Sequence, residues 1–405
     1  MKIDSPIMNT YKQLPIQFEK GHGCWLQDKG SVPYLDTSAG LAVTSLGHNH
    51  PKINAAVYAQ AKKLFHVSNQ YYIEQQYQLA ERLCEMSGLD QAFFCNSGAE
   101  ANESAIKLAR LYARKQGMSN PVIITMQYGF HGRTMGNISQ ALHNLNTYQF
   151  APLLPGFISL PFNDLSILKV CLENNPEVIA VMLEPIQGEA GVIVPSNDYL
   201  KEVRGLCDKH QALMILDEVQ TGLGRTGEYF AFQHHSIEPD IMTLAKGLAN
   251  GLPIGVCIAQ KEVSRLFEPG LHGSTFGGNP LCCAVGIAVC SVIGQSTFLK
   301  HVRETGNYLL AQLKREFGLV KEVIDIRGQG LMIALECQFD CTLLPERALK
   351  HGILINVVQQ RIIRLTPPLI ITKEQCDFLV DKLSITLQPF IRNRLKEKEK
   401  LIEAI

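Results

Sequence analysis

Residues 212–220 read ALMILDEVQ, a short apolar run that ends in two carboxylates. Three other runs consist mostly of apolar residues in the same way: VIITM at 122–126, VIAVML at 178–183 and IMTLAK at 241–246. Strands covered by helices on both faces lack polar alternation and look like this. Between the runs, residues 100–117 and 198–211 carry apolar residues at helical spacing. The pattern predicts an α/β fold with a mainly parallel central sheet.

The chain beyond Gly294 has a different pattern. It reads as helix, strands and helix again: 296–317, then 323–336 with 352–366, then from 373 onward. This predicts a smaller α+β domain over 295–405, after a large domain over 51–294. Residues 1–50 contain strand-like pieces (CWLQD, PYLD) and are expected to pack beside the smaller domain. The charged end IRNRLKEKEKLIEAI indicates a solvated helix rather than a partner motif.

Composition excludes several classes of protein. Lys+Arg and Asp+Glu each number 38 in 405 residues, so the chain has no net field to attract nucleic acid or an anionic membrane. The 12 cysteines are scattered, without CxxC or zinc-ligand spacing, which indicates a reducing compartment and no metal site. The first 20 residues lack a signal-peptide core, and the apolar stretch 282–294 is too short to span a membrane. We therefore expect a cytoplasmic protein.

The segment GLGRTG at 222–227 fits the dinucleotide-binding pattern GxGxxG. That fingerprint must follow a strand closely, open a helix and meet an acidic residue about 20 positions later. Here several residues separate the strand from Gly222, and EYFAF follows instead of a helix. A flexible loop is therefore the better interpretation, and an NAD-dependent dehydrogenase remains an alternative.

The segment NSGAE at 96–100 directly precedes the helical pattern that begins near residue 100. Backbone N–H groups at a helix start attract anions, and small residues let a phosphate approach closely. An ordinary N-cap, with Ser97 as cap and Glu100 in the first turn, explains most of the segment equally well. Capping does not account for Gly98, because glycine in a first turn costs about 1 kcal/mol relative to alanine.

Asp217 and Lys246 each stand at the carboxyl end of an apolar run. Ligands of open α/β sheets bind at that edge, although a loop-capping acid and an exposed lysine are the simpler explanations taken singly. Burial lowers the pKa of a lysine and so favours the neutral amine that condenses with aldehydes. Together with an anion cradle at 96–100, the pair indicates a pyridoxal-phosphate site.

Nearly the whole chain resembles the class III (fold type I) pyridoxal-phosphate aminotransferases, and within them the N-acetylornithine aminotransferases most. The resemblance is carried by nine segments: NTYKQLPIQFEKGHGCWLQDKG, YLDTSAGLAVTSLGHNHP, FFCNSGAEANESAIKLAR, YGFHGRTMG, LEPIQGEAGV, MILDEVQTGLGRTG, TLAKGLANGLPIG, HGSTFGGNP and IRLTPPLIIT. It implies pyridoxal 5'-phosphate as the cofactor, residues 51–294 as its binding domain, and a homodimer with active sites at the interface.

The resemblance also implies roles for individual residues. Lys246 would form the Schiff base and shuttle the proton, while Asp217 would pair with the pyridine nitrogen. The implied cofactor-binding set is Ser97, Gly98, Ala99, Phe130, Asp217, Glu218, Val219, Gln220, Lys246 and Thr275. Within this set, Thr275 would reach the phosphate of the neighbouring subunit.

Four residues are implied to bind substrate: Arg133, Glu189, Ser274 and Arg364. Glutamate brings a carboxylate beside its reacting carbon, whereas the δ-amine of acetylornithine brings only methylenes. The site therefore needs a cation that can be neutralised, and Glu189 would mask Arg364 until glutamate or 2-oxoglutarate arrives. The apolar residues around Arg364 make a surface salt bridge an unattractive explanation for it.

The implied reaction is ping-pong transfer of the δ-amino group of N-acetylornithine to 2-oxoglutarate, a step of arginine biosynthesis. Other ω-amines are close alternatives: succinylornithine, succinyl-diaminopimelate, ornithine and 4-aminobutyrate. Ornithine aminotransferases usually carry a tyrosine near the position of Gly40, so glycine there favours an acylated amine. A catalytically inactive scaffold is a third class of explanation, which the intact set of charged residues disfavours.

Overall fold

The computed structural model describes residues 6–141 and 145–403. Its centre is a seven-stranded sheet in which five adjacent strands are parallel and β10 is antiparallel to both neighbours. The spatial order is β4 (Gln91–Cys95), β10 (Gly255–Ala259), β9 (Ile241–Leu244), β8 (Leu213–Asp217), β7 (Val178–Leu183), β5 (Val122–Met126) and β6 (Phe157–Leu160). The predicted α/β class with a mainly parallel sheet is confirmed.

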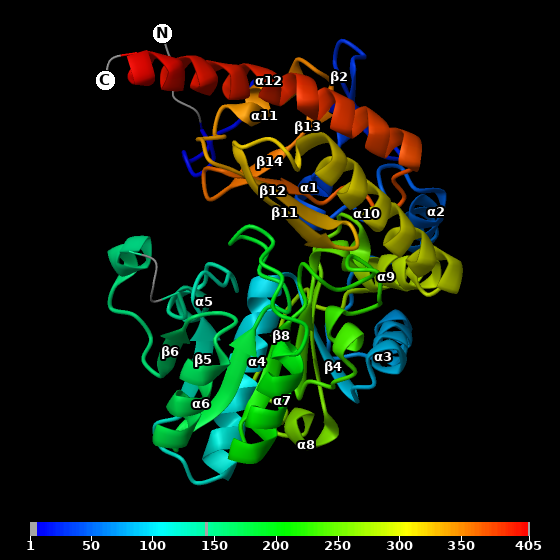
Figure 1. Cartoon of the computed structure of the whole chain (residues 1–405). Helices are drawn as coiled ribbons and strands as arrows, with labels where there is room; N and C mark the ends of the chain where they lie inside the picture. The colour runs from blue at the N-terminus through cyan, green and yellow to red at the C-terminus, as the bar shows by residue number, and fades with distance from the viewer. Residues whose placement is uncertain (1–5, 142–144, 404–405) are drawn as a thin grey trace.

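Helices cover both faces of this sheet (Figure 1). On β5, Ile123 belongs to a core cluster with residues of α4 (Gly98–Lys115), whereas Ile124 belongs to a cluster on the opposite face. That opposite face is covered by α3 (Glu74–Ser87), α6 (Leu165–Asn174) and α7 (Tyr199–His210). Successive strand side chains point to opposite faces, which explains why the interior strands are apolar throughout.

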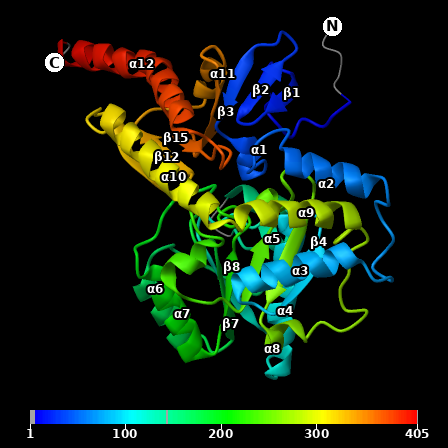
Figure 2. The ribbon, with the colours of Figure 1, turned by 90° about the vertical axis from the view of Figure 1, so that its right-hand side faces the viewer.

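The remaining elements build a second core beside the central sheet. It contains the antiparallel sheet β11 (Val323–Gln329), β12 (Met332–Cys337), β15 (Ile362–Leu365) and β14 (Asn356–Val358), with α10 (Ser296–Phe317), α11 (Leu344–Leu349) and α12 (Lys373–Glu403). The N-terminal strands β1 (Phe18–His22), β2 (Trp25–Asp28) and β3 (Pro33–Asp36) lie beside α11 (Figure 2). β3 pairs in parallel with β13 (Ile353–Leu354), so the two ends of the sequence share this core. The expected solvation of side chains beyond residue 391 lies outside the described residues.

The segment at 222–227 opens no helix and forms a run of turns, which agrees with the predicted loop. The expectation of flexibility is wrong, because Arg225 and Thr226 are each 1% exposed. Gly224 and Gly227 have φ values of +88° and +98°, a region in which glycine carries no steric cost. The glycines therefore let a tightly packed loop turn, and they are not explained by a dinucleotide.

No single helix within the described ranges is long and apolar enough to cross a membrane. The pair α9 (Pro280–Ile293) and α10 meets the criterion by length and composition only when taken together, and a 71° bend separates the two helices. All 12 cysteines are unpaired, and most of them are buried.

Candidate active site

A cavity of about 470 Å³ lies at the carboxyl edge of the central sheet, where β8 and β9 end. The structure brings most of the predicted residues together on its wall: Ser97, Gly98, Ala99, Phe130, Arg133, Glu189, Asp217, Val219, Gln220 and Lys246. The parallel strands explain this meeting, because their carboxyl ends share one edge of the sheet.

The helix α4 begins at this cavity with a built-in cap. Ser97 Oγ accepts a hydrogen bond from the backbone N–H of Glu100 at 3.2 Å, so the capping interpretation holds. The first turn still presents N–H groups that have no partner inside the helix, which suits an anion. A Cβ on Gly98 would lie 2.8 Å from a methyl group of Val219, so the glycine is required by close packing.

Asp217 is 3% exposed and sits in a network of hydrogen bonds. Its Oδ2 accepts from Asn102 Nδ2 at 2.8 Å and lies 2.7 Å from His131 Nδ1, and its Oδ1 accepts from the N–H of Val219 at 3.0 Å. Burial would lower the pKa of His131, but the hydrogen bond and charge of Asp217, with that of Glu184, leave it raised. Asp217 therefore favours the protonated form of His131.

Sequence reasoning missed Asn102 and His131. Asn102 is 1% exposed on the buried stripe of α4, and its Oδ1 accepts from Thr243 Oγ1 at 2.7 Å. A polar residue on an otherwise apolar helical stripe was the available signal. His131 Nε2 is buried without a hydrogen-bond partner among the described residues. A buried nitrogen of this kind is typical of a site that receives a ligand or water.

Lys246 follows β9 and has a φ of +42°, an unusual value for a residue with a side chain. Burial lowers the pKa of its amine, and the nearby charge of Glu189 opposes that effect. A lowered pKa increases the neutral fraction of the amine, which is its nucleophilic form. Backbone strain at such a position is common where a reactive group must be held in place.

Glu184 is a further residue that the sequence reasoning missed. Its carboxylate accepts from the backbone N–H groups of Phe130 at 2.9 Å and Gly188 at 3.0 Å. It therefore joins the residue before His131 to the one before Glu189. Burial raises the pKa of Glu184 to about 7, and the charge of His131 opposes the rise.

Glu218 does not line the cavity, in contrast to its predicted place among the cofactor-binding residues. Its carboxylate accepts from the backbone N–H of Phe232 at 2.9 Å and from the Thr221 hydroxyl group. Asp217 and Glu218 are adjacent on a strand end, so their side chains point in different directions. Burial raises the pKa of Glu218 to about 7.

The raised pKa of Glu218 predicts a pH-dependent stability. The folded protein retains the Glu218 proton up to about pH 7, whereas an unfolded carboxyl group loses it near 4.5. The free energy of unfolding should therefore fall as pH rises from 4.5 to 7, by on the order of 3 kcal/mol from this group. Glu218→Gln cannot titrate and should lose that part of the slope in denaturant unfolding at pH 5 and 7.5. An unchanged slope would show that Glu218 titrates normally in the folded protein.

Glu189 and Arg364 form the predicted ion pair. Arg364 Nη1 donates to Glu189 Oε1 at 2.6 Å and to Gln220 Oε1 at 3.3 Å, and Arg364 Nε donates to Asn356 Oδ1 at 3.1 Å. Arg364 is 1% exposed. Burial would raise the pKa of Glu189, but the charge and hydrogen bond of Arg364 outweigh burial and lower it. Glu189 thus occupies Arg364 Nη1 as long as its carboxylate stays in place.

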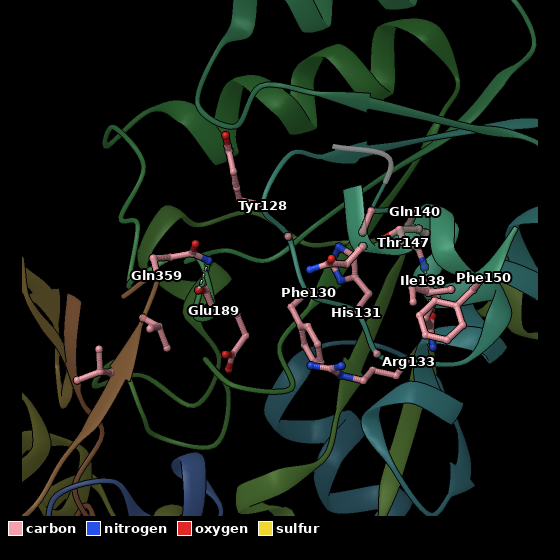
Figure 3. Close-up of a pocket in the computed structure, with 17 residues that line it drawn as sticks. Tyr128, Phe130, His131, Arg133, Ile138, Gln140, Thr147, Phe150, Glu189 and Gln359 are labelled. Atoms are coloured by element: carbon pink, nitrogen blue, oxygen red, sulfur yellow. Dashed lines mark hydrogen bonds between the residues drawn. The ribbon is translucent and has the colours of Figure 1, made fainter. Parts of the chain in front are cut away.

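A second cavity of about 760 Å³ adjoins the first. The two share Glu189 and the segment Phe130–Arg133, and Figure 3 shows Phe130 and Arg133 between Glu189 and Phe150. The Arg133 guanidinium lies 5.8 Å from the centre of the Phe130 ring. Arg133 therefore stands at the junction, where a substrate entering from the larger cavity would meet it.

Ser274 and Thr275 line neither of these cavities. They lie with His66, Asn69 and other residues around a separate cavity of about 440 Å³. Ser274 Oγ accepts from Asn96 Nδ2 at 3.2 Å, just before the start of α4. The structure thus places both residues near, but outside, the cavity of their own chain.

These features fit pyridoxal phosphate. A helix start can take the phosphate, and a buried carboxylate and a lysine with a lowered pKa line the same cavity. Over the described part of the chain, no group of three or more His, Cys, Asp or Glu residues could hold a metal ion. The family profile of the class-III aminotransferases matches residues 7–387, so the chain belongs to this pyridoxal-phosphate-dependent family.

Individual members of the family are similar to this chain over nearly their whole length. The acetylornithine aminotransferase of Nitrosomonas europaea is 45% identical over 97% of this chain and 100% of its own length. That of Methanocaldococcus jannaschii is 43% identical over 93% of this chain and 94% of its own. Among solved structures, the ornithine aminotransferase of Toxoplasma gondii superposes with a TM-score of 0.92 at 33% identity, covering 96% of this chain and 94% of that one. The acetylornithine aminotransferase of Elizabethkingia anophelis superposes with a TM-score of 0.85 at 32% identity, covering 94% of this chain and 96% of that one.

Proposed function

We propose that this enzyme transfers the δ-amino group of N2-acetyl-L-ornithine to 2-oxoglutarate, giving N-acetyl-L-glutamate 5-semialdehyde and L-glutamate in arginine biosynthesis. The observation that carries the proposal is the Glu189–Arg364 pair, closed at 2.6 Å, whose Glu189 lines the same cavity as Lys246. Relatives named acetylornithine aminotransferase, at 42–46% identity over nearly the full length, support it.

In this proposal the residues of the chain divide the work. When bound, pyridoxal phosphate supplies an aldehyde for the amino group and a ring that acts as an electron sink. The N–H groups of Gly98 and Ala99 and the Ser97 hydroxyl hold its phosphate, while Asp217 keeps the ring nitrogen protonated. Lys246 accepts and returns the proton at the reacting carbon through Nζ. The two substrates take turns at this one site.

The charged pair explains how one site serves two donors. The δ-amine of acetylornithine reacts beside methylenes, and the pair stays closed because no carboxylate competes for Arg364. Glutamate brings an α-carboxylate, which can replace Glu189 on the guanidinium with similar geometry. Arg133 takes the remote carboxylate of either substrate from the junction of the two cavities.

Arg364→Met should therefore act on one half of the reaction. We expect kcat/KM for glutamate and 2-oxoglutarate to fall by about 10²-fold, because charge-assisted hydrogen bonds to the α-carboxylate are lost. The half-reaction with acetylornithine should change less than about threefold, since that substrate makes no such contact. Stopped-flow absorbance of the bound cofactor measures both. Arg361→Met is the matched control, because Arg361 is nearby but exposed and pairs with Glu336. Equal losses with both donors would contradict the assignment.

A panel of amino donors tests the function itself. With 2-oxoglutarate as acceptor, acetylornithine should give the highest kcat/KM among acetylornithine, succinylornithine, N-succinyl-diaminopimelate, ornithine and 4-aminobutyrate. Gly40 is exposed, and a Cβ there would meet only Val43, a residue of the cavity wall, within 4 Å; this open space supports an acylated substrate. A clear preference for an unacylated amine would replace the proposed substrate with that amine.

We also propose that the enzyme is a homodimer whose active sites lie at the subunit interface. Exposed aromatic residues occur on α2 (Pro51–Ala61), α3, their connection and the loop before α9: Tyr58, Phe65, Tyr71, Tyr72, Tyr77 and Phe276. Asn69 ties this connection to the loop through hydrogen bonds to the carbonyl groups of Ser274 and Gly277. The position of Thr275 outside its own cavity supports a role in the partner's site.

The dimer predicts a coupled loss of assembly and cofactor. Phe276→Glu places a charge on the 61%-exposed aromatic residue beside Thr275, so it should shift sedimentation toward monomer and weaken cofactor binding together. Leu319→Glu, at a 97%-exposed apolar residue after α10, should change neither. A Phe276→Glu protein that stays dimeric with full cofactor would contradict this interface.

Two further assignments complete the proposal. The chain divides into an N-terminal segment (1–50), a cofactor-binding domain (51–294) and a C-terminal domain (295–405), which the separate cores and the β3–β13 pairing support. The enzyme works in the cytoplasm, which the 12 unpaired cysteines support.

A further inference from the structure

The loop 222–227 (GLGRTG) is the feature that cofactor and substrate binding leave unexplained. It begins two residues after Gln220 and carries Arg225, one of the largest fully buried side chains of the protein. Burial lowers the pKa of Arg225 to about 9, so the guanidinium is charged at neutral pH. A buried charge at this place needs a structural or functional reason.

Arg225 holds three separate segments through oxygen atoms. Its Nη1 donates to the carbonyl groups of Leu331 at 3.0 Å and Pro367 at 2.6 Å, and its Nη2 donates to Ser45 Oγ at 3.4 Å. Among the described residues it bonds no carboxylate, and its Nε has no hydrogen-bond partner. The guanidinium thus connects the central-sheet region to the C-terminal core and to the N-terminal segment.

The backbone of the loop fits closely against the turn between β11 and β12. The carbonyl group of Arg225 accepts from the N–H of Leu331 at 3.0 Å, so the two residues bond each other twice. A Cβ on Gly330 would lie 2.7 Å from the carbonyl oxygen of Arg225 and 2.5 Å from the carbonyl carbon of Thr226. No side chain fits between these backbones, so the contact has little freedom to slide.

The segment of Pro367, held by Arg225, leads back to Arg364 of the Glu189–Arg364 pair, called here the substrate switch. Pro367 follows Arg364 by three residues and lies two residues beyond the end of β15, and Gln220 contacts the Arg364 guanidinium at 3.3 Å. We propose that Arg225 is a positioning residue that fixes the strand carrying Arg364, and so sets the affinity for substrates with a carboxylate beside the reacting carbon. This inference rests on the proposed function.

Glu189, the other member of the substrate switch, is also held by an arginine. Arg327, on β11, donates to the carbonyl groups of Gly191 at 2.7 Å and Val192 at 3.0 Å, in the loop that follows Glu189. Each member of the Glu189–Arg364 pair is therefore fixed by an arginine, Arg327 or Arg225, that binds backbone carbonyl groups across the boundary between the central-sheet region and the C-terminal core. The two contacts together keep the pair at a defined separation.

The test compares Arg225→Lys and Arg225→Met with Arg303→Met. Arg303 contacts the same loop, at the Gly227 carbonyl group (2.6 Å), but makes no contact with the strand of Arg364, and its side chain is 43% exposed. The readouts are the two half-reactions of the cofactor-loaded enzyme, and calorimetric binding of glutarate, a dicarboxylate that cannot react. Arg225→Lys keeps the positive charge and the aliphatic part of the side chain. It therefore tests the role of Arg225 if Arg225→Met does not fold.

We expect both Arg225 variants to raise the KM for glutamate and 2-oxoglutarate at least fivefold. The KM for acetylornithine and the cofactor absorbance should stay within twofold, glutarate binding should weaken, and Arg327→Met should give the same pattern. Arg303→Met should change the KM values for both donors by the same factor or leave both unchanged. Parallel changes for both donors in Arg225→Lys, or no change, would overturn the inference. If the wild-type enzyme rejects acetylornithine, the proposed function fails, and the comparison is made with its preferred ω-amine instead.

Discussion

Lys246→Ala is expected to lower transamination by at least about 10⁴-fold, because the variant loses both the covalent attachment of the cofactor and the group that moves the proton. Lys246 lies on the cavity wall at the end of β9, and burial lowers the pKa of its amine. Among the described residues, no second lysine lines this cavity. Rates of each half-reaction and the absorbance of bound cofactor measure the effect.

Lys201→Ala is the control for Lys246, since Lys201 is exposed on α7 and does not line the cavity. It should retain wild-type rates. Added methylamine should restore part of the activity of Lys246→Ala, because a free amine can enter the space left by the side chain. Near-normal turnover in Lys246→Ala without added amine would refute the mechanism.

Asp217→Asn is expected to lower both half-reactions by at least about 10²-fold. The amide has nearly the same shape but no charge to keep the ring nitrogen protonated. One of its two positions must also become an NH₂ group, although Asp217 now accepts hydrogen bonds at both oxygens. The pKa of His131 should fall, because the charge and hydrogen bond of Asp217 raise it. Half-reaction kinetics and imidazole NMR measure the two effects.

Glu218→Gln separates this effect from a general loss of buried charge. Glu218 adjoins Asp217 and is 1% exposed, but its carboxylate points to Thr221 and Phe232. Its variant should change stability and its pH dependence while leaving rates within about threefold. Similar rate losses in both variants would mean that Asp217 acts through the fold and not through the cofactor.

Much of the fold could be predicted because interior strands are apolar on both faces. β5 and β7 begin and end at the predicted residues, and α10 spans 296–317 as expected. The site followed from the same reasoning, because the carboxyl ends of neighbouring parallel strands meet. Asp217 and Lys246, 29 positions apart in sequence, consequently face one cavity.

Contacts between distant side chains could not be predicted. Asn102 and His131 reach Asp217 from α4 and from the loop after β5. The sequence around neither residue indicates that Asp217 is its hydrogen-bond partner. The orientation of Glu218, whose carboxylate bonds Thr221 and Phe232, could not be predicted for a related reason, since adjacency in sequence does not fix where a strand-end side chain points. The buried loop at 222–227 looked flexible because glycines permit both mobility and close packing.

The sequence by itself determined the order of strands and helices, the family and the chemical groups of the site. These follow from local periodicity and from motifs of contiguous residues, which need no knowledge of the rest of the chain. Only the tertiary structure decided that Glu189 closes on Arg364 at 2.6 Å and that Arg225 holds the Pro367 carbonyl group. Those contacts depend on how two separate cores pack against each other, and hydrogen bonds over such long sequence separations leave no periodic trace.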